Sequence, residues 1–145
     1  MPLVQREFSV NSSQETVWNL LNNPAALGKL VPGCEEVTSL SEREWKWTVK
    51  FSVGVVSRRM EAIARVLEKE PIEHLSIKLD SVENDFKATL TLDLENAPPS
   101  TRVKMSANVE ARGPFQMIVN QMIKGQLDKL IVEFAENMSK ELSTV

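Results

Sequence analysis

The chain of 145 residues suits one domain with its own hydrophobic core, and a content of 42% hydrophobic and 26% charged residues is typical of a globular protein. The formal net charge of −3 and an isoelectric point near 5.3 argue against a nucleic-acid partner, because binding nucleic acid requires a surplus of cations. A single cysteine forms no internal disulfide, and Arg6 and Glu7 interrupt the apolar stretch that a secretory signal would need. No apolar run approaches the roughly 20 residues of a membrane span, so we expect a cytoplasmic protein.

The first elements along the chain are predicted to be one strand and two short helices. Residues Leu3–Val10 have the apolar pattern of a strand. Ser12 and Glu15 then have the spacing of a capping box, in which each side chain accepts a hydrogen bond from the other residue's backbone amide, so a helix is expected to begin there. Pro24 suits the first turn of a second helix, which is expected to end at Pro32-Gly33.

The hydrophobic period changes to two in the middle of the chain. Segments of strict alternation, separated by short turns, predict an antiparallel sheet with one buried and one solvated face. The residues predicted to share the buried face are Trp45, Trp47, Val49, Phe51 and Val53; Met60, Ala62, Ala64 and Val66; Leu75, Ile77 and Leu79; Phe86, Ala88, Leu90, Leu92 and Leu94; and Val103, Met105, Ala107, Val109 and Ala111.

After Gly113-Pro114 the period returns to 3.6, which predicts one long helix from Phe115 to about Leu142. Its apolar stripe is formed by Val119, Ile123, Leu127, Leu130 and Phe134. This stripe is the large apolar surface that can cover the buried face of the sheet. We therefore expect an α+β helix-grip fold, in which a curved antiparallel sheet of about seven strands wraps around the long C-terminal helix and two short helices follow the first strand. Residues 1–145 are expected to form a single helix-grip domain.

The sequence offers no recognisable catalytic or metal-binding motif. His74 is the only histidine and is expected to be exposed on the polar side of its strand; with Cys34 as the only cysteine, a His/Cys zinc site is excluded. Nearby Glu35 and Glu36 would raise the pKa of the Cys34 thiol, which disfavours a nucleophile, so we expect Cys34 to be a small structural residue. Nucleotide-binding and serine-hydrolase motifs are absent as well. We therefore expect no catalytic residue, no metal and no cofactor.

Small and large apolar residues mix on the predicted buried face, and this mixture is compatible with two kinds of interior. The alanines either let the long helix pack closely or leave a cavity with apolar and aromatic walls. Such a cavity would bind a hydrophobic small molecule. Its predicted lining residues are Trp47, Phe51, Met60, Ala62, Leu90, Leu92, Met105, Val119, Met122 and Ile123. Gln126, a polar residue on the helix stripe, either anchors the polar end of a ligand or satisfies a backbone group.

The chain resembles the carbon monoxide dehydrogenase G-subunit (CoxG) family, a part of the START-like, Bet v 1-like (SRPBCC) helix-grip superfamily. The resemblance lies in VWNLLNNPAALGKLVPGCEEV (Val17–Val37) and in the closing helix GPFQMIVNQMIKGQLDKLIVEF, and its most specific part is the turn of Pro32, Gly33, Cys34 and Glu35. It implies that this turn shapes the mouth of a cavity for hydrophobic ligands such as lipids. It also implies an accessory or maturation role for a molybdenum-containing dehydrogenase, and it brings no established catalytic motif.

Three functions are compatible with these observations, and the first is favoured. It is a noncatalytic protein that binds an apolar small molecule or lipid, with a molybdenum-dehydrogenase complex as a further partner. The second is a cyclase, dehydratase or hydrolase on the same scaffold; it needs an inward acid or base, for which Arg6 and Gln126 are the nearest candidates. The third is a protein-docking module with a packed interior. The chain ends NMSKELSTV, without the C-terminal extension by which many family members attach to membranes, so membrane association is not expected.

Overall fold

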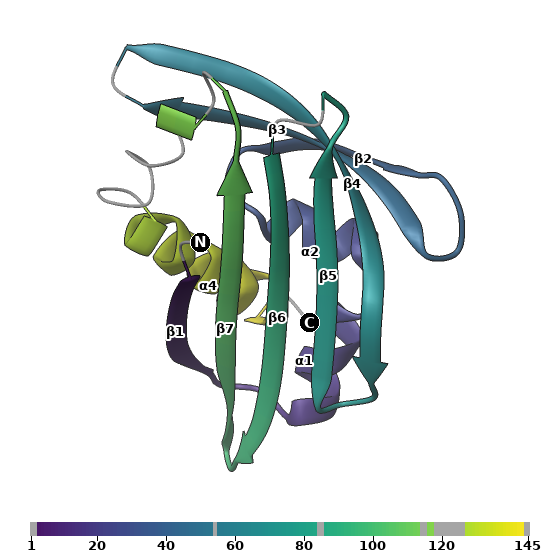
Figure 1. The fold of residues 1–145 in the computed structure, drawn as a ribbon. Coiled ribbons are helices and arrows are strands. Elements are labelled where there is room, and N and C mark those ends of the chain that lie inside the picture. Colours follow the sequence, from purple (N-terminus) through teal and green to yellow (C-terminus); the bar gives the residue numbers. More distant parts are fainter. Residues whose placement is uncertain (1–2, 54, 84–85, 114–115, 118–126, 144–145) are drawn as a thin grey trace.

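The computed structural model describes residues 3–53, 55–83, 86–113, 116–117 and 127–143. The elements in these ranges are β1 (Leu3–Val10), α1 (Gln14–Leu21), α2 (Pro24–Leu30), β2 (Cys34–Ser39), β3 (Glu44–Val53), β4 (Val56–Glu70), β5 (His74–Ser81), β6 (Phe86–Ala97), β7 (Ser100–Ala111) and α4 (Leu127–Ser143). The strands form one seven-stranded antiparallel sheet in the order β1-β7-β6-β5-β4-β3-β2. Helices α1, α2 and α4 lie behind the sheet in Figure 1 and cover one of its faces, called the inner face below. This arrangement confirms the predicted α+β helix-grip fold.

The start of α1 differs by one residue from the prediction. Ser13, not Ser12, caps the helix, because its side chain accepts a hydrogen bond from the Thr16 amide (3.2 Å). Ser12 is engaged in the turn that leaves β1: its amide donates to the Val10 carbonyl (2.9 Å), and its own carbonyl accepts from the Thr101 hydroxyl (2.8 Å). The predicted capping position is therefore wrong by one residue, since a long-range contact to β7 holds Ser12.

The second helix lies close against β2 and β3. Pro24 begins α2 as predicted, and Asn23 caps it. A Cβ atom added at Gly28 would lie 2.6 Å from Val37 and 3.0 Å from the indole Nε1 of Trp47. The missing side chain of Gly28 is therefore what lets α2 approach the sheet this closely.

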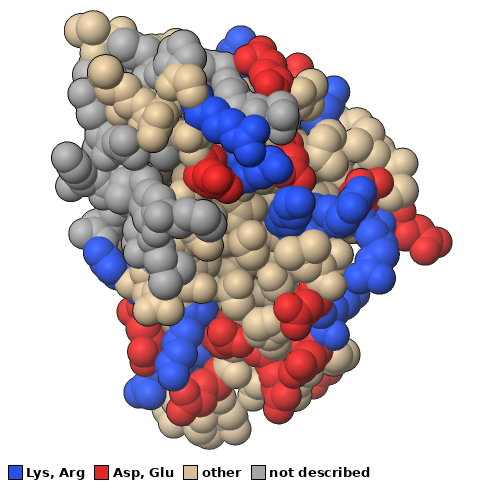
Figure 2. Space-filling model, in the orientation of Figure 1, with Lys and Arg blue, Asp and Glu red and all other residues tan. Residues whose placement is uncertain are grey.

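The predicted alternation of buried and solvated residues is confirmed along most of β6. In β5, Ser76 of the outer face is buried as well, and in β7 the four residues from Met105 to Asn108 are all half-buried. The buried residues of the inner face include Trp47, Ala62, Ala64, Leu75, Ile77, Ala88, Leu90, Leu92, Leu94, Val103 and Val109. The opposite face is polar, and acidic and basic side chains are interspersed on it (Figure 2). Cross-strand ion pairs stabilise this face, for example Arg65 with Glu44 at 2.7 Å.

A β-bulge in β4 ends the alternation before the strand itself ends. The register with β5 shifts between Val66 and Glu68, and beyond the shift Lys69 lies opposite Leu75. Residues directly opposite each other in an antiparallel pair share a face of the sheet, and Leu75 is buried on the inner face. Lys69 therefore belongs to the inner face, whereas a strict period of two continued from Val66 would place it on the outer face.

Helix α4 is the described part of the predicted long C-terminal helix. Phe134 of the predicted stripe is buried, together with Ile131 and Met138. Phe134 and Met138 belong to the core cluster that α1, α2 and the sheet share. The side-chain amide of Asn137 donates to the Leu30 carbonyl (3.0 Å), which ties α4 to the end of α2. Residues 118–126 of the predicted helix, which include Val119, Met122, Ile123 and Gln126, lie outside the described residues.

Candidate functional site

A pocket of about 550 Å³ opens between the end of α1, the β2–β3 loop and the inner face of β3, β4 and β5. Its lining residues are Leu21, Asn22, Glu42, Arg43, Trp45, Val66, Lys69, Leu75 and Ile77. The apolar members are buried or half-buried, whereas the charged members are exposed. The pocket therefore has an apolar wall and a charged mouth, and its volume lies within the range of about 300–1,000 Å³ that small-molecule sites occupy.

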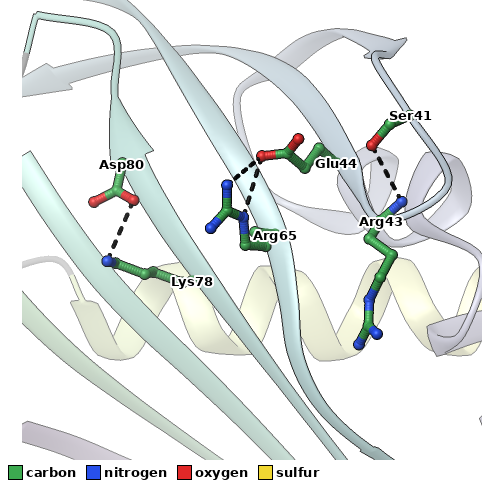
Figure 3. Close-up of polar contacts among 6 residues, drawn as sticks. All are labelled: Ser41, Arg43, Glu44, Arg65, Lys78 and Asp80. Atoms are coloured by element: carbon green, nitrogen blue, oxygen red, sulfur yellow. Dashed lines mark hydrogen bonds and ion pairs between the residues drawn. The ribbon is translucent and has the colours of Figure 1, made fainter.

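Backbone hydrogen bonds hold the β2–β3 loop, residues 40–43, against this pocket. The Val66 amide of β4 donates to the Arg43 carbonyl (3.2 Å). The Arg43 amide in turn donates to the Ser41 hydroxyl (3.4 Å), and the amide of Ser41 donates to the Glu44 carbonyl (3.2 Å). Figure 3 shows the side chain of Arg43 extending away from the Arg65–Glu44 ion pair. The loop thus places Arg43 at the mouth through bonds that do not involve its guanidinium.

The predicted lining residues whose side chains are described lie on the same inner face but do not line this pocket. Trp47, Ala62, Leu90 and Leu92 are buried in the core, and Met60 and Met105 are half-buried. The side chain of Phe51, like those of Val119, Met122, Ile123 and Gln126, lies outside the described residues. That these residues surround a ligand stays a prediction.

Sequence reasoning found only part of the described pocket. Trp45, Val66, Leu75 and Ile77 were assigned to the buried face from their alternation, but no signal marked them as a wall. The charged mouth was missed, because residues 40–43 are a loop and because a bulge places Lys69 on the inner face.

The indole nitrogen Nε1 of Trp47 is a polar atom buried in the core. The residue is only 1% exposed, and its indole Nε1 has no hydrogen-bond partner among the described residues. It packs beside Gly28 and is not part of the pocket lining.

The turn at Pro32, Gly33, Cys34 and Glu35 joins α2 to the sheet, as expected for a structural turn. Gly33 has a φ of +85°, and its carbonyl accepts from the Lys50 amide of β3 (2.8 Å). These residues do not line the described pocket, so their place at the mouth of a cavity stays a prediction.

Cys34 has the properties of a structural residue. It is half-buried, and its Sγ lies 3.7 Å from the Glu36 carbonyl, to which it donates. Burial, aided by the negative charge of Glu35, raises the pKa of the Cys34 thiol, although the bond to Glu36 opposes this. A raised thiol pKa disfavours the thiolate, in line with the prediction that Cys34 is no nucleophile.

His74 lies on the outer face as predicted, but it is not exposed. Its side chain is 23% exposed, and its Nδ1 lies 2.5 Å from the Asp93 carboxylate on the neighbouring strand. The two residues are directly opposite each other in the β5–β6 register. The expectation of an exposed histidine was wrong because strand pairing, which a single strand does not reveal, supplies a partner.

The His74–Asp93 pair predicts a pH dependence of stability. The hydrogen bond to Asp93, supported by the charges of Asp93, Glu68 and Glu70, raises the pKa of His74 above its ordinary value of 6.5 although burial opposes the rise. The pair's contribution is therefore full below about pH 6.5 and is lost as the pH rises through the folded-state pKa. We expect the difference in free energy of unfolding between the wild type and Asp93→Asn to shrink between about pH 6 and about pH 9 in urea titrations.

Asp80→Asn is the matched control for this prediction. Asp80 is also an outer-face aspartate of this sheet, but its partner is Lys78 (3.6 Å) rather than a histidine. Its effect should stay constant over the same pH interval. A constant difference for Asp93→Asn as well would contradict the prediction.

No group of three or more His, Cys, Asp or Glu side chains is placed to hold a metal ion among the described residues. Within the same ranges, no helix is both long enough and apolar enough to cross a membrane. That the protein needs no metal or cofactor stays a prediction.

An antiparallel sheet with helices on its inner face and an apolar-walled pocket beneath them defines the helix-grip fold, which a START superfamily protein of known structure shares. More particularly, the chain belongs to the carbon monoxide dehydrogenase G-subunit (CoxG) family, whose family model matches residues 7–143. The resemblance predicted from the sequence is thereby confirmed. A search of curated proteins finds no match to this sequence.

Solved structures show the same fold at low sequence identity. A conserved protein from Geobacillus kaustophilus is 22% identical, with a TM-score of 0.83 over 99% of this chain and 96% of that one. A START superfamily protein from Mycobacterium smegmatis is 14% identical, with a TM-score of 0.77 over 98% of this chain and 97% of that one. Norcoclaurine synthase from Thalictrum flavum is 16% identical, with a TM-score of 0.67 over 98% of this chain and 86% of that one. At these identities the likeness concerns the fold alone.

Proposed function

We propose that this chain is a noncatalytic binding protein for an apolar small molecule or lipid. The observation that carries the proposal is the pocket of about 550 Å³, whose wall consists of Leu21, Trp45, Val66, Leu75 and Ile77. Apolar walls with a few polar groups at one end are typical of small-molecule sites, because burial of the ligand's apolar surface supplies the binding free energy. The START-like fold of the CoxG family is compatible with this use of the inner face.

The polar groups of the described pocket favour binding over catalysis. A carboxylate that acts as a general acid or base near neutral pH usually needs burial to shift its pKa. Glu42, the carboxylate among the lining residues, is exposed. Arg6, a candidate from the sequence, is exposed on β1, where it donates to the Gln5 carbonyl (2.6 Å). Neither group is placed in an apolar interior.

The family suggests the partner. We propose that the chain serves as an accessory or maturation factor for a molybdenum-containing dehydrogenase, since the CoxG family is named for carbon monoxide dehydrogenase. Sedimentation of the chain mixed with such a dehydrogenase, purified from the same source, tests this part. A joint species supports it, and two independently sedimenting species contradict it.

The ligand part is tested with the apolar fluorescent probe N-phenyl-1-naphthylamine. We expect its fluorescence to rise on binding to the wild type, and we expect Val66→Phe to weaken binding about tenfold, because the larger ring fills part of the pocket. Val66 is half-buried and lines the pocket. Leu67→Phe is the control, since Leu67 is 43% exposed and outside the lining.

Circular dichroism of both variants shows whether the fold is kept. Equal binding by Val66→Phe and the wild type would place the probe elsewhere and contradict the proposed site. A wild type that binds no probe would contradict the function itself.

A further inference from the structure

We propose that the pocket selects amphiphiles with an anionic headgroup, a carboxylate or a phosphate, which Arg43 and Lys69 hold at the mouth while the apolar tail lies along the wall. This inference rests on the proposed function and adds the chemical class of its ligand. It comes from the charged side of the pocket, which the family resemblance did not point to.

The bulge in β4 is the first observation behind this proposal. It adds a residue between Val66, which lines the apolar wall, and Lys69, which lies opposite Leu75 of the same wall. Without the bulge, the ammonium group would point to the outer face. Bulges re-aim side chains in this way beside many functional sites. Here the effect is to bring a cation to the edge of an apolar pocket.

The second observation is that Arg43 has no acidic partner among the described residues. Other arginines of the described sheet are paired with carboxylates: Arg59 with Glu35 at 2.6 Å, Arg65 with Glu44 at 2.7 Å and Arg102 with Glu7 at 2.9 Å. For the guanidinium of Arg43, no hydrogen bond or ion pair to another described residue is found. Its backbone is nevertheless held by β4 through the Val66 amide (3.2 Å).

A guanidinium held in this way is suited to an incoming anion. Arginine presents a planar set of donors that matches a carboxylate or phosphate, and lysine adds a second, more flexible donor. These bonds are stronger with a negatively charged headgroup than with a neutral one, because both the donor and the acceptor are then ionised.

The remaining polar groups of the mouth do not cancel this preference. Glu42 is the acidic member of the lining, and Asn22 is neutral. The charges of Arg43, Lys69 and Glu42 therefore sum to one positive charge, on a protein whose overall formal charge is −3. A ligand with a cationic headgroup would face net repulsion, and a ligand with a neutral headgroup would gain weaker hydrogen bonds and no ion pair.

The test is displacement of bound N-phenyl-1-naphthylamine by three ligands with the same tail: dodecanoate, dodecyl phosphate and dodecanol. We expect the two anions to displace the probe at concentrations about tenfold lower than dodecanol does. The double variant Arg43→Gln, Lys69→Gln should lose this preference, so that the two anions displace the probe from it no better than dodecanol does. Acetate and inorganic phosphate are included to test whether a tail is needed, and they should displace no probe.

The control is the double variant Arg102→Gln, Lys78→Gln. It also removes two positive charges, but from the outer face, where Arg102 pairs with Glu7 and Lys78 pairs with Asp80. It should keep the preference for anions, which separates a local effect from a change in overall charge.

The outcomes distinguish this inference from the proposed function. If dodecanol competes as well as the anions, or if both double variants lose the preference equally, the inference is overturned while the proposed function stands. Displacement of the probe by inorganic phosphate or acetate, which have no apolar tail, also overturns the inference. If the wild type binds neither the probe nor any ligand with a dodecyl tail, both the inference and the proposed function fail.

Discussion

Replacing Gly33 by alanine is expected to lower the free energy of unfolding by about 3–5 kcal/mol. The φ of +85° disfavours any residue with a Cβ atom, and the new Cβ would lie 2.1 Å from the backbone carbonyl oxygen of Lys50. A backbone atom in the middle of β3 cannot rotate away as a side chain can. Relief therefore requires α2 and β3 to separate, which breaks the hydrogen bond between the Gly33 carbonyl and the Lys50 amide.

Gly113→Ala separates the cost of the positive φ from the cost of the clash with Lys50. Gly113 also has a positive φ, +63°, but an added Cβ would meet no atom within 4 Å among the described residues beyond its chain neighbours. This control should cost only the backbone term of about 1–2 kcal/mol. Urea unfolding followed by tryptophan fluorescence measures both variants. Equal losses would contradict the prediction, because they would mean that the contact with Lys50 is not made in the folded protein.

The second large effect is expected for Phe134→Ala, at about 3–5 kcal/mol. Phe134 is only 2% exposed and belongs to the main core cluster, together with residues of α1, α2 and the sheet. Removing the ring takes away its buried apolar surface and leaves a cavity, which the surrounding strands can close only in part. The loss should appear as a lower midpoint of urea unfolding, with an unchanged slope.

Val132→Ala is the control on the same helix. Val132 is 54% exposed, so its truncation should change the free energy of unfolding by less than about 0.5 kcal/mol. Equal stability of the two variants would contradict the packing of α4 on the inner face through Phe134.

The sequence predicts well those features whose signal is local. The alternation along β6 identifies Ala88, Leu90, Leu92 and Leu94 as buried, because side chains point to opposite faces at every step of a strand. Pro24 marks the start of α2 because its fixed φ and missing amide suit the first turn of a helix. The order of such elements was enough to predict the fold class, since each apolar face has to be covered by another element.

The candidate site was predicted only in part, for a physical reason. Trp45, Val66, Leu75 and Ile77 follow from periodicity, but a buried face does not reveal where its packing leaves space. The apolar wall becomes one side of a pocket only because the end of α1 and the loop of residues 40–43 form its other sides. These segments are distant in the chain, and no short-range pattern relates them.

By itself, then, the sequence determined the period of most segments, the boundaries of α1 and α2 to within a few residues, and the face to which most side chains belong. The tertiary structure alone decided the register between strands, and with it the His74–Asp93 pair and the bulge that moves Lys69 to the inner face. Register and bulge position depend on how two whole strands fit against their neighbours, not on the residues of either strand taken alone.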